Sequence, residues 1–486
     1  MEGSPGRSLS QGRCAKIICT LGPSTNSDEV VDRLLQAGMD AARINLGLGT
    51  PGDHVARIRR LCTQPGSKRR PVAIIADLPG RRIRIGRLEG GRAQLEVGDL
   101  VTFSRDRGEM GNGARLPVDD GLFHDNMARG DQVLLSDGLV ELVITKMGNA
   151  ELEAEVIAGG AVMERTGVHA PGMPLQGGPL TQADLPLLKM AVEQRVDYLA
   201  LTYITDASEI LAVREQLEKL GANIPLIVKI ERLEAFARLD GILKRSDAIM
   251  IRRGDLGAQI EVTRVPLVQK EILRLAQSAG VPVIIATQML GSMISSPTPT
   301  RAEASDVSNA IADGADGVLL SSETAIGKYP VESVSMMARI ISETERERIH
   351  PPPKPRAETF PSPFADTTAS IAVQAAEHTR AKLIACFTES GRTARLVSKY
   401  RPSVPIIAFC SNDETRQRLA VHWGVRSDKL EISRDVETTV KNVEERLLSR
   451  GLVRHGDRLV IVFGAPVGEK GHTNSVRLHE VGGRTN

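Results

Sequence analysis

The 486-residue chain is poor in aromatic residues and contains no long apolar run. Aromatic side chains make up 3% of the residues, which is too few for the stacking platforms that bind single-stranded nucleic acid. The net charge is only +2, so no basic surface is expected to attract a polyanion. No run of about 18 apolar residues is present, and the N-terminus has no apolar signal core. We therefore expect neither a nucleic-acid partner nor a membrane span.

Cysteines are also few: five are scattered along the chain, with no Cys-x-x-Cys pair and no zinc-ligand spacing. An odd, scattered set is typical of reduced thiols, which favours a cytoplasmic location. Hydrophobic residues make up 41% of the chain and charged residues 25%, as in ordinary globular proteins. The length is sufficient for about three domains.

Eight short apolar runs alternate with amphipathic stretches, and this pattern predicts a (β/α)8 TIM barrel. The amphipathic stretches include 29–37 and 266–279, the second of which opens with a proline, as helices often do. In such barrels the chemistry lies where the strands end. The apolar runs are 15–20, 42–46, 72–77, 198–202, 225–230, 248–251, 281–287 and 317–321.

The barrel pattern is interrupted once and followed by another pattern. Residues 82–170 form short alternating segments separated by glycine, which predicts an inserted small β-barrel that covers the barrel mouth as a lid. We therefore assign 14–81 and 171–348 to the barrel and 1–13 to a flexible N-terminal arm. A proline-rich stretch opens residues 349–486, where strands and helices alternate again. This last part predicts a C-terminal doubly wound α/β domain.

Lys229 and Glu231 lie two residues apart at the end of one apolar run, and Asp255 follows the next run. Residues i and i+2 of a strand share one face, so an ammonium and a carboxylate project together at the strand end. Magnesium prefers one or two carboxylates plus substrate oxygens, and phosphoryl transfer needs mainly positioning and positive charge. On its own, a Lys-x-Glu pair is more often a salt bridge at the end of a strand than a functional site.

Ten motifs are spread along the chain, at 16–23, 42–45, 229–231, 253–257, 286–290, 299–303, 305–307, 309–310, 313–316 and 322–325. Taken in order, these motifs resemble the pyruvate kinase family over essentially the whole chain. The resemblance implies a phosphotransferase that moves the phosphoryl group of phosphoenolpyruvate to ADP, giving pyruvate and ATP in glycolysis. It also implies Mg²⁺, with Mn²⁺ as an alternative, an allosteric C-terminal domain and a homotetramer.

The family's functional residues carry over onto matching positions. Glu231 and Asp255 would hold magnesium, and Lys229 would neutralise the phosphoryl group during transfer. Arg43 would grip the phosphate, unless it only forms an ion pair at a strand end. Thr287 would lie in the proton path through water, unless it only caps the following helix. Backbone amides at Gly254 and Asp255 would bind the substrate carboxylate, and Pro23 and Asn45 would contact the nucleotide.

The chain departs from the family's potassium site. Gly47 and Leu48 replace a serine ligand and a histidine beside the nucleotide, and Leu78 replaces a threonine ligand. Asn45 and Asp77 are the ligands that remain. Family members with a basic residue at the position of Arg82 tend not to need potassium, because a guanidinium supplies the missing positive charge. We therefore expect that K⁺ is not required.

Two further departures lie near the substrate. Thr166 replaces a lid lysine, for which Arg165 is a candidate substitute, and Arg252 replaces a small residue. These changes leave two alternatives to a pyruvate kinase open. The first is a lyase or decarboxylase of oxo-acids, since magnesium-enolate chemistry also serves those reactions. The second is a low-activity paralogue that binds metabolites as a regulator.

The C-terminal domain contains a glycine-bearing strand-to-helix turn at residues 387–393. Hydroxyl and backbone N–H groups at such a turn can cradle a phosphate. The family uses this turn for phosphorylated effectors, so the resemblance implies an effector site. Its residues are Thr388, Ser390, Gly391, Arg392 and Thr393.

Overall fold

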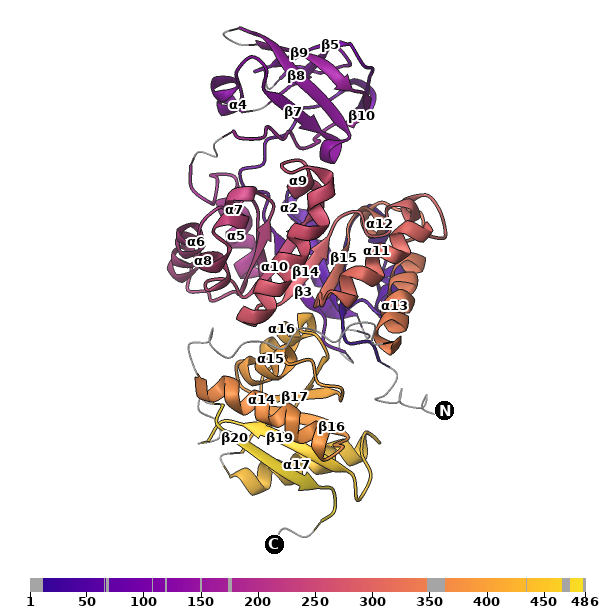
Figure 1. Ribbon diagram of the computed structural model, residues 1–486, viewed down its shortest axis with the longest axis vertical. Helices are drawn as coiled ribbons and strands as arrows, with labels where there is room; N and C mark the ends of the chain where they lie inside the picture. The colour runs from indigo at the N-terminus through magenta and orange to yellow at the C-terminus, as the bar shows by residue number, and fades with distance from the viewer. Residues whose placement is uncertain are drawn as a thin grey trace.

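The chain forms three bodies stacked along the long axis of the molecule, with the barrel between the other two (Figure 1). The structure is a computed structural model. It describes residues 12–64, 66, 70–106, 108–118, 120–148, 151–173, 177–347, 363–433, 435–465 and 473–483. Most of the predicted N-terminal arm and most of the proline-rich stretch lie outside these ranges. Arg13, at the end of the predicted arm, pairs with Asp40 of the barrel.

All eight predicted strands of the TIM barrel are present, and they close into a parallel barrel in the order β1-β15-β14-β13-β12-β11-β3-β2. Apolar runs of this kind suit strands that are buried on both faces. The strands are β1 (Lys16–Thr20), β2 (Ala41–Asn45), β3 (Ala73–Asp77), β11 (Tyr198–Leu201), β12 (Leu226–Ile230), β13 (Ala248–Arg252), β14 (Val283–Ala286) and β15 (Gly317–Leu320).

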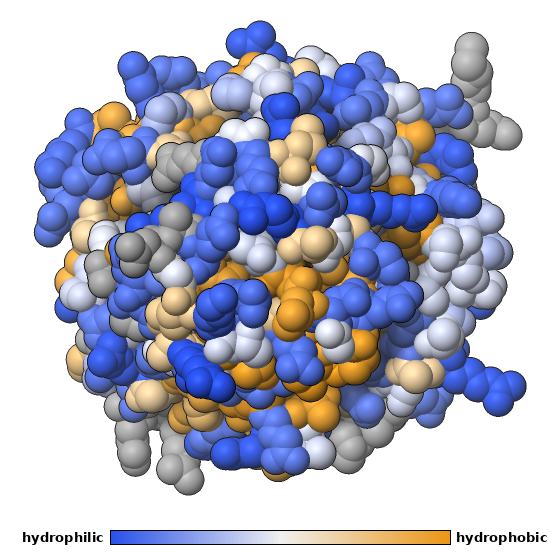
Figure 2. Space-filling view, turned by 90° about the horizontal axis from the view of Figure 1, so that it is seen from above, coloured by the Kyte–Doolittle hydropathy of each residue, from blue (hydrophilic) through white to orange (hydrophobic). Residues whose placement is uncertain are grey.

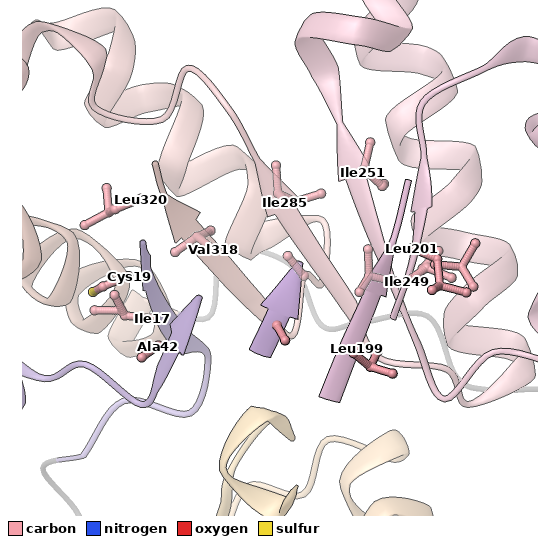
Figure 3. Close-up of a cluster of buried hydrophobic side chains, with 14 of the residues drawn as sticks. Ile17, Cys19, Ala42, Leu199, Leu201, Ile249, Ile251, Ile285, Val318 and Leu320 are labelled. Carbon is pink, nitrogen blue, oxygen red and sulfur yellow. The ribbon is translucent and has the colours of Figure 1, made fainter. Parts of the chain in front are cut away.

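Alternate side chains of each strand serve two separate cores. Ile17 and Cys19 of β1 belong to the outer set, which packs beneath the surrounding helices, as Figure 3 shows for several strands. Ile18 belongs to the inner set, which fills the barrel together with Ile75 and Ile227. Residues two positions apart on a strand therefore face the same side. At the strand ends, side chains of the inner set face the barrel mouth.

Helices surround the barrel, and α10 begins with a proline in its first turn as predicted. The longer helices are α1 (Asp28–Ala37), α2 (Pro51–Thr63), α5 (Asp184–Glu193), α6 (Ala207–Lys219), α10 (Val265–Ala279), α11 (Arg301–Ala312) and α13 (Pro330–Glu347). The short ones are η2 (Pro23–Thr25), α7 (Leu233–Ala237), α8 (Leu239–Leu243), α9 (Arg253–Gly257), η5 (Val262–Arg264), η6 (Gly291–Ile294) and α12 (Ser322–Ala325).

The lid has its own apolar core and lies above the barrel, with η4 packed against α9. Its strands pair as a five-stranded sheet in the order β6-β5-β9-β8-β7 and a two-stranded sheet of β10 and β4. Figure 2 looks down on this end of the molecule and shows mostly hydrophilic residues, with an apolar area between them. The elements are η3 (Glu89–Gly91), β4 (Arg92–Leu95), β5 (Leu100–Ser104), β6 (Arg115–Pro117), α4 (Gly121–Asn126), β7 (Gln132–Leu135), η4 (Ser136–Gly138), β8 (Val140–Met147), β9 (Glu151–Ala158) and β10 (Gly160–Met163).

The C-terminal domain is a five-stranded sheet in the order β18-β17-β16-β19-β20, with separate apolar clusters on its two faces. The last strand is antiparallel to its neighbour and the others are parallel. The elements are α14 (Pro363–His378), β16 (Leu383–Phe387), α15 (Arg392–Lys399), β17 (Ile406–Cys410), α16 (Asp413–Arg418), η8 (Leu419–Val421), β18 (Val425–Lys429), α17 (Val436–Ser449), β19 (Arg458–Phe463) and β20 (Ser475–Glu480).

The C-terminal domain closes the lower end of the barrel. Ala420 and Val421 of η8 belong to the apolar cluster inside the barrel. The Tyr198 hydroxyl donates to the carbonyl of Arg418 at 2.8 Å, and the Lys16 ammonium donates to the carbonyl of Val425 at 2.8 Å. Residues of η8 therefore cover the lower end of the barrel. None of the described helices is long and apolar enough to cross a bilayer.

Candidate active site

A cavity of about 490 Å³ lies between the barrel mouth and the lid. Residues from both bodies line it, including Arg84, Ser136, Thr166 and Gly167 of the lid. The predicted site residues that line it are Pro23, Arg43, Asn45, Asp77, Arg82, Lys229 and Thr287.

The alternation of side chains along each strand explains why these residues meet at the barrel mouth. Ile227 faces the barrel interior, so Lys229 and Glu231 face the mouth on the same side of β12. Met250 also faces the interior, so Arg252 at the end of β13 faces the mouth too. Because Ile230 pairs with Ile251 in the parallel register, Glu231 and Arg252 end up side by side.

Asp77 joins two cationic side chains at the centre of the site. Its Oδ1 lies 2.8 Å from the Lys229 ammonium, and its Oδ2 lies 2.6 Å from Nε of Arg43. Burial alone would raise the pKa of Asp77, but Lys229 and Arg43 lower it far below its usual range. Burial lowers the pKa of Lys229, and the two nearby carboxylates Asp77 and Glu231 oppose that shift. The strand-end ion pair considered for Arg43 is thus present, and it places the guanidinium at the cavity wall.

Glu231 and Asp255 are both buried, and two arginines contact them. Arg252 places one guanidinium nitrogen 3.1 Å from Oε1 of Glu231 and the other 3.0 Å from Oδ2 of Asp255. Arg82 from the lid junction contacts Oδ1 of Asp255 at 2.7 Å. Although burial alone would raise it, these two arginines lower the pKa of Asp255 to about 2. Asp255 is therefore ionised at neutral pH.

The donor set fits a divalent cation of the magnesium type. Two buried carboxylates on neighbouring strands are enough, because magnesium takes its remaining ligands from water and substrate. Among the residues that the structure describes, no three His, Cys, Asp or Glu side chains converge as a metal site. A cation held only by Glu231 and Asp255 thus needs substrate oxygens, as in phosphoryl transfer. The guanidinium of Arg252 lies between the two carboxylates.

Thr287 connects the end of β14 to the start of α9. Its hydroxyl accepts the N–H of Gly254 at 3.2 Å and donates to the carbonyl of Ala286 at 2.5 Å. Its backbone has φ +72°, which is uncommon for a β-branched residue and costs about 1–3 kcal/mol. Arg253 supports this turn by donating to the carbonyl of Thr287 at 2.8 Å. The hydroxyl therefore faces the adjacent α9 amide rather than capping the helix that follows it.

Comparisons with known proteins match the chain along nearly its whole length. The family model "Pyruvate kinase, barrel domain" matches residues 12–334, and "Pyruvate kinase, alpha/beta domain" matches residues 366–479. The chain belongs to the pyruvate kinase family. The pyruvate kinase of Mycobacterium intracellulare is 37% identical over 470 residues, which cover 97% of this chain and 99% of that protein. The pyruvate kinase of Bacillus licheniformis is 38% identical over 475 residues, which cover 97% of this chain and 81% of that protein. This chain is accordingly a phosphotransferase.

Asn45 and Asp77, the two residues expected to remain from a potassium site, lie on neighbouring strands. Asn45 pairs with Asp77 in the register of β2 and β3, and its side-chain oxygen accepts the N–H of Gly47 at 3.1 Å. Both oxygens of Asp77 bind cationic side chains, as described above. Arg82, predicted to stand in for potassium, lines the same cavity as Asn45 and Asp77 and contacts Asp255.

Arg84 is a cavity residue that the sequence reasoning missed. It lines the cavity, and its guanidinium donates to the carbonyl of Arg165 at 2.8 Å. Burial, followed by the nearby Arg82 charge, lowers its pKa to about 10. Arg165, which was the candidate for the missing lid lysine, is exposed and does not line the cavity. The spacing of Arg82 and Arg84 by two residues was the available signal, since it places both on one face of an extended segment.

A side chain at Gly47 would also approach Arg84. A Cβ atom there would lie 3.6 Å from a guanidinium nitrogen of Arg84 and 3.2 Å from Pro79. A Cβ atom at position 47 would therefore make an ordinary contact with Arg84 and a tight one with Pro79.

The predicted effector turn joins β16 to α15. Gly391 has φ +81° and precedes the helix without a side-chain cap. Thr388 is buried, and the Thr393 hydroxyl lies 2.9 Å from that of Thr473. Ser390 is exposed and Arg392 is half-buried. The five residues are thus contiguous at one end of the sheet, well away from the cavity under the lid (Figure 1).

Proposed function

We propose that the protein is an active pyruvate kinase that transfers the phosphoryl group of phosphoenolpyruvate to ADP. The observation that carries this proposal is the position of Lys229, which is 2% exposed and lies between Asp77 and Glu231 at the barrel mouth. A fixed ammonium held there can stabilise negative charge on a phosphoryl group in transfer without reorganising at that moment.

Each of the other site residues has a role in this proposal. Arg43 binds a phosphate oxygen, and the α9 amides of Gly254 and Asp255 bind the substrate carboxylate. Glu231 and Asp255 hold Mg²⁺, or Mn²⁺ in its place, which supplies positive charge to the phosphate oxygens when bound. The phosphorus–oxygen bond of the enol phosphate breaks as a terminal oxygen of ADP bonds to phosphorus. The resulting enolate takes a proton at its methylene carbon from water ordered by Thr287.

We further propose that the nucleotide lies against Pro23 and Asn45 and that K⁺ is not required. The fixed charge of Arg82 supports the second point, because its guanidinium lines the same cavity as the potassium-site remnant Asn45 and Asp77. Washing the protein into potassium-free buffer tests this proposal, as the Discussion describes.

The C-terminal turn is proposed to bind a phosphorylated effector, with Thr388, Ser390, Gly391, Arg392 and Thr393 as its contacts. The glycine at φ +81° that precedes α15 without a side-chain cap and the three hydroxyl side chains support this choice. By analogy with the family, we propose a cytoplasmic homotetramer. Titration of sugar phosphates against the wild type and Thr393→Val, with turnover as readout, tests the effector site. Activation that persists unchanged in the variant would move the site elsewhere.

The experiment that tests the main proposal is a product assay with phosphoenolpyruvate, ADP and Mg²⁺. Pyruvate that forms only when ADP is present supports the kinase. Pyruvate or other products formed from oxo-acids without nucleotide would identify a lyase instead. Tight phosphoenolpyruvate binding without turnover would identify a metabolite-binding regulator.

A further inference from the structure

Arg252 occupies the space through which a divalent cation would reach both Glu231 and Asp255. One oxygen of each carboxylate already has a partner other than Arg252. Oε2 of Glu231 accepts the N–H of Tyr203 at 2.8 Å, and Oδ1 of Asp255 contacts Arg82 at 2.7 Å. The remaining oxygens, Oε1 of Glu231 and Oδ2 of Asp255, are the two that the guanidinium of Arg252 contacts.

The metal and this guanidinium therefore compete for the same oxygens. Magnesium approaches its oxygen ligands to about 2.1 Å, which leaves no room for a guanidinium on the same lone pairs. Arg252 is also held in register by β13, whose last residue it is. Its side chain lines the cavity in which an anionic substrate group would bind.

The balance of charge at the site also indicates that the metal and the guanidinium of Arg252 compete. Without a metal, the cationic groups of Arg43, Arg82, Lys229 and Arg252 outnumber the three carboxylates Asp77, Glu231 and Asp255 by one. A divalent cation added to this buried arrangement would increase the excess of positive charge. The increase is costly where water is excluded, unless an anion arrives with the cation or a guanidinium leaves.

We propose that Arg252 is a built-in competitor of the divalent cation, which lowers the metal affinity of the enzyme until an anionic substrate group draws the guanidinium away. This inference rests on the proposed function, because it assigns the metal to Glu231 and Asp255. It makes metal and substrate anion bind cooperatively, since each favours the arrangement in which Arg252 has left the carboxylates.

The test measures Mn²⁺ binding to the full-length protein without substrate, by the loss of the free-ion electron paramagnetic resonance signal. The variants are Arg252→Ala and Arg252→Gln, and the matched control is Arg57→Ala. Arg57 lines the same cavity but hydrogen-bonds Asn26 instead of a site carboxylate. We expect both Arg252 variants to bind Mn²⁺ at least about tenfold more tightly than the wild type. The control is expected to match the wild type.

Thermal unfolding supplies a second readout. Removal of Arg252 leaves two buried carboxylates with less compensating charge, so the variants are expected to melt earlier without metal. Mn²⁺ should then raise their Tm by more than it raises that of the wild type. If Arg252→Ala fails to fold, Arg252→Gln keeps a hydrogen-bonding group and is used alone.

Equal Mn²⁺ affinity in the wild type and both Arg252 variants would overturn the inference, as would an absence of Mn²⁺ binding in all of them. Turnover of phosphoenolpyruvate by the wild type is measured separately. Turnover with unchanged Mn²⁺ affinity would refute the competitor role of Arg252 and leave the proposed kinase intact. Tighter Mn²⁺ binding in the variants without wild-type turnover would support the competitor role of Arg252 and refute the proposed kinase.

Discussion

The Lys229 ammonium reaches across the barrel mouth to Asp77, with 2.8 Å between Nζ and Oδ1. The two residues lie on β12 and β3, which are separated in the closed sheet by β11. Lys229 is therefore fixed from two sides, because Oε1 of Glu231 on its own strand lies 3.8 Å away. A preorganised charge of this kind is what transfer of a phosphoryl group requires.

Replacement of Lys229 by methionine is expected to lower the rate of pyruvate formation by at least about 10²–10³-fold, the usual loss when a preorganised charge is removed. The fold should survive, because Asp77 keeps its contact with Arg43 and Glu231 keeps its contact with Arg252. A coupled pyruvate assay measures the loss, and circular dichroism checks the fold. A folded variant with near-normal turnover would remove Lys229 from the mechanism.

Replacement of Arg82 by glutamate is expected to make the enzyme dependent on potassium. The wild-type guanidinium lines the cavity and contacts Asp255, whereas a carboxylate there would leave the site short of positive charge. Turnover is measured with potassium or tetramethylammonium chloride at equal ionic strength, so that screening is constant. Arg82→Lys, which keeps the charge, serves as the control. Stimulation of the wild type by potassium of more than about tenfold would contradict the role given to Arg82.

Replacement of Thr287 by valine is expected to slow protonation of the enolate. Valine keeps the shape and the β-branching at φ +72° but removes the hydroxyl that bonds the Gly254 amide. Positioned proton donors contribute about 10²–10⁴-fold, so turnover should fall within that range. Exchange of the pyruvate methyl protons with deuterated water, followed by NMR, isolates the step. Thr287→Ser keeps the hydroxyl and should retain most of the exchange; if both variants exchange like the wild type, Thr287 has no part in it.

Asp197 gives the barrel a pH-dependent stability. Its Oδ2 accepts the N–H of Ile74 at 2.7 Å, and burial raises its pKa to about 7. A raised pKa means that the folded protein binds the proton more tightly than the unfolded chain does between about pH 4 and pH 7. The stabilising contribution is therefore complete below pH 4 and is lost as the pH rises to 7, at no more than about 1.4 kcal/mol per pH unit.

Asparagine at position 197 keeps the acceptor and removes the titration. The Tm of Asp197→Asn minus the Tm of the wild type should therefore increase as the pH rises from 4.5 to 7.5. Differential scanning calorimetry across this pH range measures the difference in Tm. Two parallel curves would show that the carboxyl does not titrate in this interval.

Much of the fold could be predicted because each barrel strand is a short apolar run that leaves little choice of boundary. β13, for example, spans Ala248–Arg252, and the apolar run in the sequence covers residues 248–251. The pairing of Lys229 with Glu231 at one strand end also follows from the two-residue alternation of a strand. These features are local, so the sequence alone is sufficient to predict them.

The partners of the arginines could not be predicted, because they depend on tertiary arrangement. The contact between Arg252 and Glu231 needs the register of β12 against β13. The contact between Arg82 and Asp255 needs the orientation of the lid junction over the barrel. The position of Arg84 at the cavity likewise depends on the fold of the lid, where its guanidinium donates to the carbonyl of Arg165.

The measurement that tests the central claim most directly is the stoichiometry of products from phosphoenolpyruvate and ADP in the presence of Mg²⁺. ATP and pyruvate are quantified in the same reaction for the wild type and for Lys229→Met. The account predicts equal amounts of ATP and pyruvate from the wild type, none without ADP, and almost none from the variant. Pyruvate without matching ATP, or no product from folded wild-type protein, would contradict it.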